Sequence, residues 1–260
     1  MKIVVLIKEV PDTWGERRLD LETGLIDRGA AAAPVLDEID ERAVEAALAH
    51  ADAHPGTEVT VLAMAPASAT ATIRKALAMG ATSGVHVVDD ALRGADLLLT
   101  AEVLAAAIRR TGYDLVIAGN LSTDGGAGVI PAMVAEVLGV PQLTGLAALE
   151  VSDTMVTGDR VSDAGTMRVS AELPAVVSIT EALPEGRFTT FKGIMAAKKK
   201  PYETVDAASL DIEPDDPATA RYIMLSVAER PPRHAGIKIV DEGDAGEKLA
   251  AFLIAEGVTR

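Results

Sequence analysis

Four glycines between residues 119 and 128 form the pattern in this sequence that could bind a charged ligand. They follow a short apolar run at residues 114–118, and residues 129–138 then show the apolar spacing of a helix. Strand, glycine loop and helix in this order bring backbone N–H groups to a helix N-terminus at the carboxyl edge of a sheet, where phosphate can bind. An ordinary turn is the alternative, because the loop has neither the G-x-G-x-x-G nor the G-x-x-x-x-G-K-[ST] pattern.

Composition limits the classes of function that this chain can have. The net charge of -15 repels polyanions, so nucleic acid and anionic membrane surfaces are not expected as partners. The sequence has no Cys, which excludes disulfides, thiol catalysis and iron–sulfur ligation, and its four His show no metal-ligand spacing. Redox chemistry would therefore need an organic cofactor. No apolar run is long enough to span a bilayer, and we expect a cytoplasmic protein without membrane insertion.

Apolar runs and helical patterns alternate along the first half of the chain, which predicts an α/β fold with a doubly wound, mostly parallel sheet. Only 3% of the residues are aromatic, as expected for aliphatic strands covered on both faces by Ala-rich helices. Strands are expected at residues 2–8, 58–64, 84–88 and 113–118, and helices at residues 37–53, 67–79, 95–110 and 129–138. Further on, a small antiparallel meander is expected at residues 147–156 and 160–173, followed by a strand at residues 174–180.

The predicted α/β domain spans residues 1–201 and ends in a protruding loop at residues 179–201. This loop holds two Phe, one Ile and one Met close together without clean periodicity, which suggests a surface that another protein covers. Residues 202–260 contain an acidic stretch, a Pro pair and one amphipathic helix at residues 246–256. This composition is typical of an arm that contacts another subunit, or of a loosely docked terminal extension.

Two features near the strand ends have both a structural and a functional interpretation. The acids that include Asp37 and Asp40 suit the start of a helix, although one of them could instead contact a ribose or an adenine. Trp14 is the only Trp of the chain and follows the first strand. Its ring could pack on a cofactor or could cover the end of the sheet.

Three separated stretches resemble the β subunits of the electron transfer flavoproteins, and the resemblance covers nearly the whole chain. They are Thr-Ile-Arg-Lys-Ala-Leu-Ala-Met-Gly-Ala at residues 72–81, Leu-Pro-Ala-Val-Val at 173–177 and Gly-Ile-Met-Ala-Ala-Lys-Lys-Lys at 193–200. The resemblance implies an adenine-nucleotide α-hydrolase-like fold and a heterodimer whose α subunit carries the electron-transferring FAD. This chain would bind AMP, help to enclose that FAD, and have no catalytic residues of its own. Electrons would pass from partner flavin dehydrogenases to a membrane quinone oxidoreductase.

Carried over by position, the family's cofactor contacts fall at expected strand ends and at turns between strands and helices. They are Leu6, Asp37, Glu38, Ile39, Asp40, Met64, Gly119, Asn120, Leu121, Ser122, Thr123, Asp124, Gly125, Gly126, Ala127, Gly128, Val129 and Ile130. The contacts that would dock partner dehydrogenases are Phe191, Ile194, Met195, Lys198, Lys199 and Lys200. Phe191 stands where the family has a Leu anchor, and Ala196 stands where it has a methylatable Lys.

The glycine loop departs from the family's mammalian-type loop, which has three successive acids followed by Asn-Gln-Thr. Electron-bifurcating relatives bind a second FAD where others bind AMP, and their loop shares the Asp-Gly pair found at Asp124 and Gly125. We favour AMP over a second FAD, because Asp37 and Glu38 would repel a longer pyrophosphate tail. From a different class, the alternative is a stand-alone adenine-nucleotide sensor of universal-stress type, which would need neither residues 188–200 nor the arm.

Overall fold

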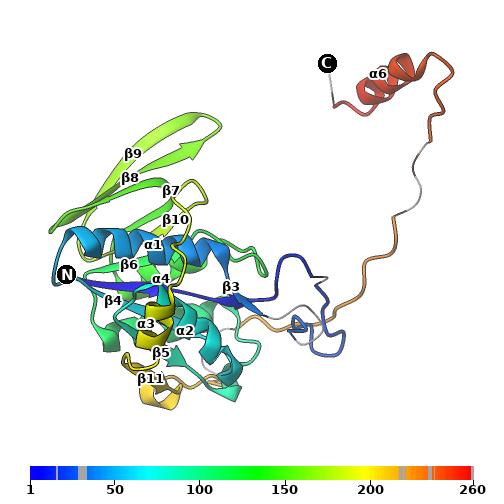
Figure 1. The fold of residues 1–260 in the computed structure, drawn as a ribbon. Coiled ribbons are helices and arrows are strands. Elements are labelled where there is room, and N and C mark those ends of the chain that lie inside the picture. The colour runs from blue at the N-terminus through cyan, green and yellow to red at the C-terminus, as the bar shows by residue number, and fades with distance from the viewer. Residues whose placement is uncertain are drawn as a thin grey trace. The chain divides into compact units, whose positions relative to one another are not determined.

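The computed structural model describes residues 1–15, 17–28, 34–216, 219, 221–233, 236 and 238–258. The chain divides into two compact units, Met1–Leu225 and Ser226–Arg260. The first unit contains a large mixed sheet with helices on both faces (Figure 1). The second unit contains a single helix among its described residues.

The main sheet has nine strands in the order β11-β5-β4-β1-β6-β10-β7-β8-β9. The six pairings from β11 to β7 are parallel, and the two pairings from β7 to β9 are antiparallel. This topology confirms the predicted doubly wound sheet with its antiparallel meander. The strands are β1 (Lys2–Leu6), β4 (Glu58–Met64), β5 (Ser83–Val87), β6 (Leu115–Gly119), β7 (Gln142–Val151), β8 (Met155–Ser162), β9 (Gly165–Glu172), β10 (Ala175–Ile179) and β11 (Tyr202–Val205). A separate antiparallel pair joins β2 (Glu9–Val10) to β3 (Val35–Leu36).

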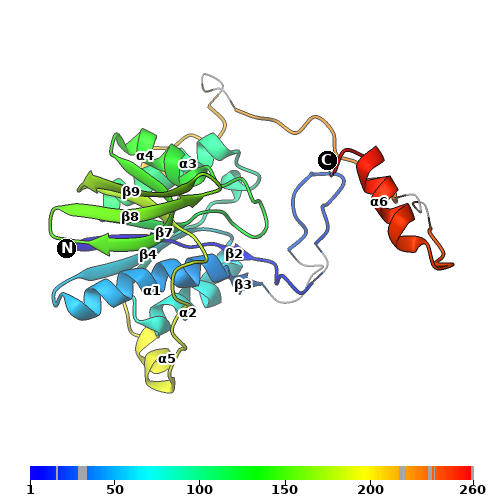
Figure 2. The same ribbon diagram turned by 90° about the horizontal axis from the view of Figure 1, so that it is seen from above.

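Helices cover both faces of the parallel part of this sheet, and for that reason its central strands are apolar on both faces. Helices α1 (Glu38–Ala53) and α2 (Thr70–Met79) pack on one face, against residues such as Val5 and Ile117. Helices α3 (Leu97–Thr111) and α4 (Ile130–Leu138) pack on the other face, against Val4 and Val116 (Figure 2). The described residues also include three short 3-10 helices, namely η1 (Ala67–Ala69), η2 (Asp90–Leu92) and η3 (Ala208–Leu210).

Helix α5 (Phe191–Ala197) and strand β11 are among the elements that form where no regular structure was predicted. Helix α5 forms inside the expected protruding loop and packs against α2. Strand β11 pairs in parallel with β5 at the edge of the main sheet. Both elements are short, so their sequences carry little periodicity of their own.

The division between the units lies later than the expected start of an arm at residue 202. Val205 and Leu210 are buried and belong to the core of the first unit. In the second unit, α6 (Ala245–Ala255) lies at the predicted amphipathic helix, and none of its residues is buried. Its Leu249, Phe252 and Ile254 are all exposed. None of the helices in the described ranges is both long enough and apolar enough to cross a membrane.

Ending the chain after Leu225 should leave the first unit folded, because its core lies before that residue and α6 buries nothing. The free energy of unfolding measured in urea should change by less than about 0.5 kcal/mol. Ending the chain after Pro201 serves as the contrasting variant, since it also removes β11 and the buried Val205 and Leu210. Loss of cooperative unfolding in the longer truncated chain would show that the second unit contributes to the fold.

Candidate functional site

A cavity of about 830 Å³ opens at the carboxyl ends of the central strands. Leu6 of β1, Met64 of β4 and Gly119 of β6 reach its wall from three neighbouring strands. Ligands of open α/β sheets bind at this edge, because the loops after parallel strands converge there. The cavity therefore lies where the sequence pattern predicted a binding site.

The glycine loop and the N-terminus of α4 form one side of this cavity. Gly128 and Ile130 line it, and no side chain in the described part of the chain caps this helix. Gly126 and Gly128 adopt φ values of 63° and 67°, which favour glycine over residues with a side chain. A helix N-terminus that lacks a side-chain cap and follows a glycine loop can bind an anionic group through its backbone N–H groups.

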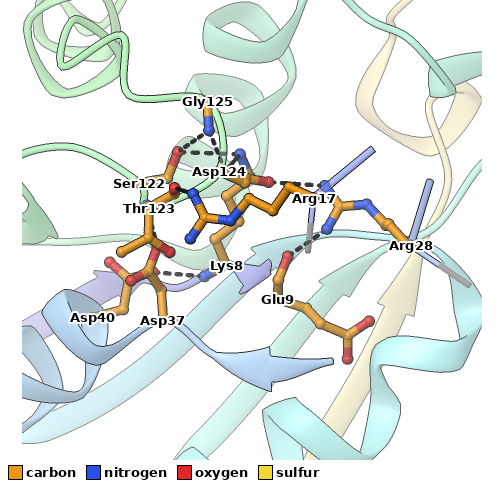
Figure 3. A network of polar contacts seen from close by, with 10 residues as sticks. All are labelled: Lys8, Glu9, Arg17, Arg28, Asp37, Asp40, Ser122, Thr123, Asp124 and Gly125. Atoms are coloured by element: carbon orange, nitrogen blue, oxygen red, sulfur yellow. Dashed lines mark hydrogen bonds and ion pairs between the residues drawn. The ribbon is translucent and has the colours of Figure 1, made fainter. Parts of the chain in front are cut away.

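Asp124 fixes the glycine loop to the segment that follows β1 (Figure 3). Lys8 Nζ lies 2.6 Å from Asp124 Oδ1, and Arg28 Nη2 lies 3.1 Å from Asp124 Oδ2. The backbone N–H of Gly125 also donates to Oδ1, at 2.6 Å. Burial alone would raise the pKa of Asp124, but the hydrogen bonds and the charge of Lys8 outweigh it and lower this pKa to about 2. The carboxylate therefore stays charged at neutral pH and ties the two loops together.

Asp37 holds the same loop from the side of α1. Its Oδ2 accepts hydrogen bonds from Thr123 N at 2.8 Å and from Thr123 Oγ1 at 3.2 Å, and Asp37 has no exposed surface. Burial raises the pKa of Asp37. Asp37 and Glu38 line a second, smaller cavity of about 170 Å³ together with Trp14. The two acids thus lie outside the wall of the main cavity.

Asp40 joins the ends of β1 and β6 at the cavity wall. Its Oδ2 accepts the backbone N–H of Lys8 at 2.8 Å. A Cβ at Gly119 would lie 2.8 Å from Asp40 Oδ1 and 2.6 Å from Ile39 Cγ2, so the close approach of α1 to β6 requires glycine there. Burial, followed by the neighbouring charge of Asp37, raises the pKa of Asp40 well above its usual range.

The structure brings most of the predicted cofactor-binding residues to the main cavity. Those that line it are Leu6, Asp40, Met64, Gly119, Asn120, Leu121, Ser122, Gly125, Ala127, Gly128 and Ile130. Thr123 lies at the second cavity, while Ile39 belongs to the apolar core. Asp124, Gly126 and Val129 are close in sequence to lining residues but are not part of the wall.

Three cationic residues at the main cavity were missed from the sequence, namely Lys8, Arg28 and Arg93. Lys8 carried a usable signal, since it comes directly after the apolar run of the first strand. Arg28 and Arg93 carried none, because each lies in an irregular connection whose path depends on the fold. In the described part of the chain, no three His, Cys, Asp or Glu side chains are grouped so as to hold a metal ion.

The residues expected to dock partners lie in α5 and directly after it. Phe191 is 81% exposed, and Ile194 and Met195 are about half exposed one turn further on, so the three share one helical face. Lys198 and Lys199 are exposed as well. Lys200 differs from them, because its Nζ donates hydrogen bonds to three backbone carbonyls of the body.

Trp14 is 94% exposed. It therefore does not cover the end of the sheet, which was one of the two interpretations of this residue. It stands beside the smaller cavity lined by Asp37 and Glu38. The other interpretation, contact with a cofactor, stays a prediction.

Residues 30–210 match the family model described as the electron transfer flavoprotein domain. The chain is 48% identical to the electron transfer flavoprotein subunit beta of Mycobacterium leprae over 98% of both chains. The chain belongs to the electron transfer flavoprotein family, as a β subunit. It is also 35% identical to the electron transfer flavoprotein subunit beta of Syntrophomonas wolfei, over 97% of this chain and 96% of that protein. Its identity to the caffeyl-CoA reductase-Etf complex subunit CarD of Acetobacterium woodii is 32%, over 83% and 82% of the two chains.

The family assignment confirms the resemblance found in the sequence. The β subunits of this family are electron-carrier subunits of flavoproteins, so FAD is the cofactor of the complex.

Replacing Asp124 with Asn should destabilise the protein at pH 7 by about 2 kcal/mol, the value that a fall in pKa from 3.8 to about 2 represents. The lowered pKa means that this stability is present above pH 3.8 and disappears as the pH falls through about 2. Urea denaturation of both proteins at several pH values measures the difference. Asp163→Asn, at an exposed position in the β8–β9 turn, is the matched control. An equal difference at pH 7 and pH 2 would contradict the assignment.

Proposed function

We propose that this β subunit pairs with an α subunit of its family and that the heterodimer carries electrons on the FAD of the α subunit. The similarity to β subunits over nearly the full chain supports this pairing. The exposed apolar residues of α6 also support it, because an amphipathic helix with no buried residue is suited to packing on another protein. The stand-alone sensor accounts for neither α5 nor α6.

The second part of the proposal is that the main cavity holds an adenine nucleotide. Its phosphate would meet the backbone N–H groups of residues 127–130 at the N-terminus of α4, because those of Gly125 and Gly126 already donate to Asp124 and to the carbonyl oxygen of Ser122. Lys8 and Arg28 lie beside the same loop, both paired with Asp124, in a cavity wall that also contains five Asp side chains. Leu6 and Met64 offer apolar surface for the adenosine. The single observation that carries this proposal is the cavity's position at the uncapped start of α4.

AMP is the nucleotide that the family resemblance implies, and we propose it for this cavity. A second FAD is the other candidate, and two observations favour it. Asp37 and Glu38, which were expected to repel a longer tail, line the smaller cavity instead of the main one. The volume of about 830 Å³ also falls in the upper part of the range for small-molecule sites, roughly 300–1,000 Å³. Both candidates share the adenosine phosphate that the glycine loop would bind.

Extraction of nucleotides from the co-expressed heterodimer tests the ligand directly. We expect one FAD and one AMP per heterodimer, whereas two FAD and no AMP would establish the second candidate. Gly128→Val should remove the nucleotide of this subunit but not the FAD of the α subunit, because valine disfavours the φ of 67° at this position. Gly56→Val is the matched control with little expected effect on occupancy, since Gly56 also has a positive φ but does not line the cavity. Full occupancy in the Gly128→Val heterodimer would contradict binding at this loop.

The third part of the proposal is that partner flavin dehydrogenases dock on the exposed face of α5, and that a membrane quinone oxidoreductase accepts the electrons. Phe191, Ile194 and Met195 form an apolar surface that a partner's pocket can cover. Lys198 and Lys199 place positive charge beside it, on a strongly acidic protein, and can orient an approaching partner.

Phe191→Ala should slow electron transfer from a partner dehydrogenase by about tenfold, since truncating an interface anchor typically costs more than 1 kcal/mol. Flavin content and heterodimer assembly should not change, because Phe191 is 81% exposed in this subunit. Stopped-flow flavin reduction measures the rate. Val161→Ala, at a 61% exposed apolar position in β8, is the control for loss of exposed apolar surface elsewhere. An unchanged rate with every tested partner would remove α5 from the docking surface.

A further inference from the structure

Helix α5 is too short to be stable by itself. It has seven residues, and isolated helices shorter than about 12–15 residues are marginal in water. Its N-terminus is capped by Thr190, whose side chain accepts a hydrogen bond from the N–H of Gly193 at 3.0 Å. The orientation of its apolar face must therefore come from contacts with the rest of the subunit.

The contact surface for α5 is the second half of α2 and the turn after it. A Cβ at Gly193 would overlap the carbonyl oxygen of Ala78, so glycine allows α5 to approach the backbone of α2 directly. Arg74 Nη1 donates to the carbonyl oxygen of Ala197 at 2.5 Å, and its guanidinium group lies 4.6 Å from the ring centre of Tyr202. Arg74 thus links the end of α5 to β11.

Lys200 makes the most extensive of these contacts. Its Nζ lies 2.8 Å from the carbonyl oxygen of Leu77, 3.0 Å from that of Gly80 and 2.6 Å from that of Ala81. An ammonium group has three N–H donors, so this arrangement uses all of them. The acceptors lie at the C-terminus of α2, where the helix leaves carbonyl groups without partners and attracts positive charge.

Together these contacts give residues 72–81 a role that neither the cavity nor the docking face explains. These residues form a socket for α5 and the residues after it. The socket consists of the Arg74 side chain and the backbone carbonyl groups of residues 77, 78, 80 and 81. Burial in this socket lowers the pKa of Lys200. Lys198 and Lys199 have the same sequence context but remain exposed.

We infer that Lys200 is a positioning residue, which anchors α5 on α2 and so presents the docking face in a fixed orientation. This inference rests on the proposed docking function of α5, and it assigns Lys200 a different role from Lys198 and Lys199. A docking charge acts through solvent and is screened by salt, whereas an anchor acts through short hydrogen bonds inside the subunit. The two roles therefore predict different responses to ionic strength: the effect of losing a docking charge fades as salt is raised, and the effect of losing an anchor does not.

The test compares Lys200→Met with Lys199→Met in the co-expressed heterodimer. Lys200→Met should raise the KM for the partner dehydrogenase by about tenfold with little change in kcat, because only a minor fraction of α5 keeps the docking orientation. This loss should be the same at low and high salt. Lys199→Met should have a smaller effect that fades as salt is raised. Lys200→Arg should recover part of the loss, since arginine also offers several donors to carbonyl groups.

Hydrogen exchange of the heterodimer without any partner provides a second readout. The backbone amides of residues 193–197 should exchange faster in Lys200→Met and should be unchanged in Lys199→Met. If Lys200→Met does not fold, Arg74→Met should show the same faster exchange, because it removes only the bond to Ala197 and the stacking on Tyr202. Unchanged exchange, or a loss of affinity that fades with salt, would overturn the anchor. If amide exchange is faster in Lys200→Met but Phe191→Ala does not change the electron-transfer rate, the docking function is overturned and the anchoring role of Lys200 is kept.

Discussion

The ion pairs of Asp124 with Lys8 and Arg28 are the interaction on which the geometry of the cavity depends. Lys8 follows β1 and Asp124 lies in the loop after β6, so the first pair joins the connections of two adjacent parallel strands. Arg28 brings in a third segment and also donates to the carbonyl oxygen of Glu9 at 2.8 Å. Because the side chain of Asp124 is only 4% exposed, water screens these pairs weakly. These ion pairs thus hold the loops at the edge of the cavity in place relative to one another.

The ion pairs of Asp124 with Lys8 and Arg28 also affect how an anionic ligand could be bound. Asp124 neutralises much of the charge on Lys8 and Arg28, so the phosphate end of the cavity depends on backbone N–H groups for direct contacts. The side chains of Lys8 and Arg28 are nevertheless 41% and 33% exposed, and both residues line the cavity. Asp20, Asp27, Asp40, Asp89 and Asp90 line the same cavity, so its wall has more acidic than basic side chains. The backbone N–H groups at the start of α4 must therefore provide the main attraction for a phosphate, with Lys8 and Arg28 as partly paired cations nearby.

The parallel sheet and the position of its cavity could be predicted from the sequence because both follow from local patterns. Apolar runs define the strands, and the carboxyl ends of parallel strands must meet at one edge. The residues that were missed depend on distant partners. Arg28 and Arg93 reach the cavity from irregular connections. Helix α5 and strand β11 are short, and they are stabilised by packing on α2 and by pairing with β5. Lys200 has the same sequence context as two exposed lysines, and only the carbonyl groups of α2 distinguish it.

Helix α2 connects the two regions to which the proposals assign functions. The turn before it contributes Ala65 and Pro66 to the cavity wall, and the carbonyl groups at its other end accept the hydrogen bonds of Lys200. Ten residues of helix span about 15 Å, so a rigid element separates the main cavity from the exposed face of α5. The anchor contacts use backbone carbonyls and the inner side of α5, which leaves its outer side free to vary. If α5 docks partners as proposed, a substitution at Phe191 would alter partner choice without disturbing the cavity.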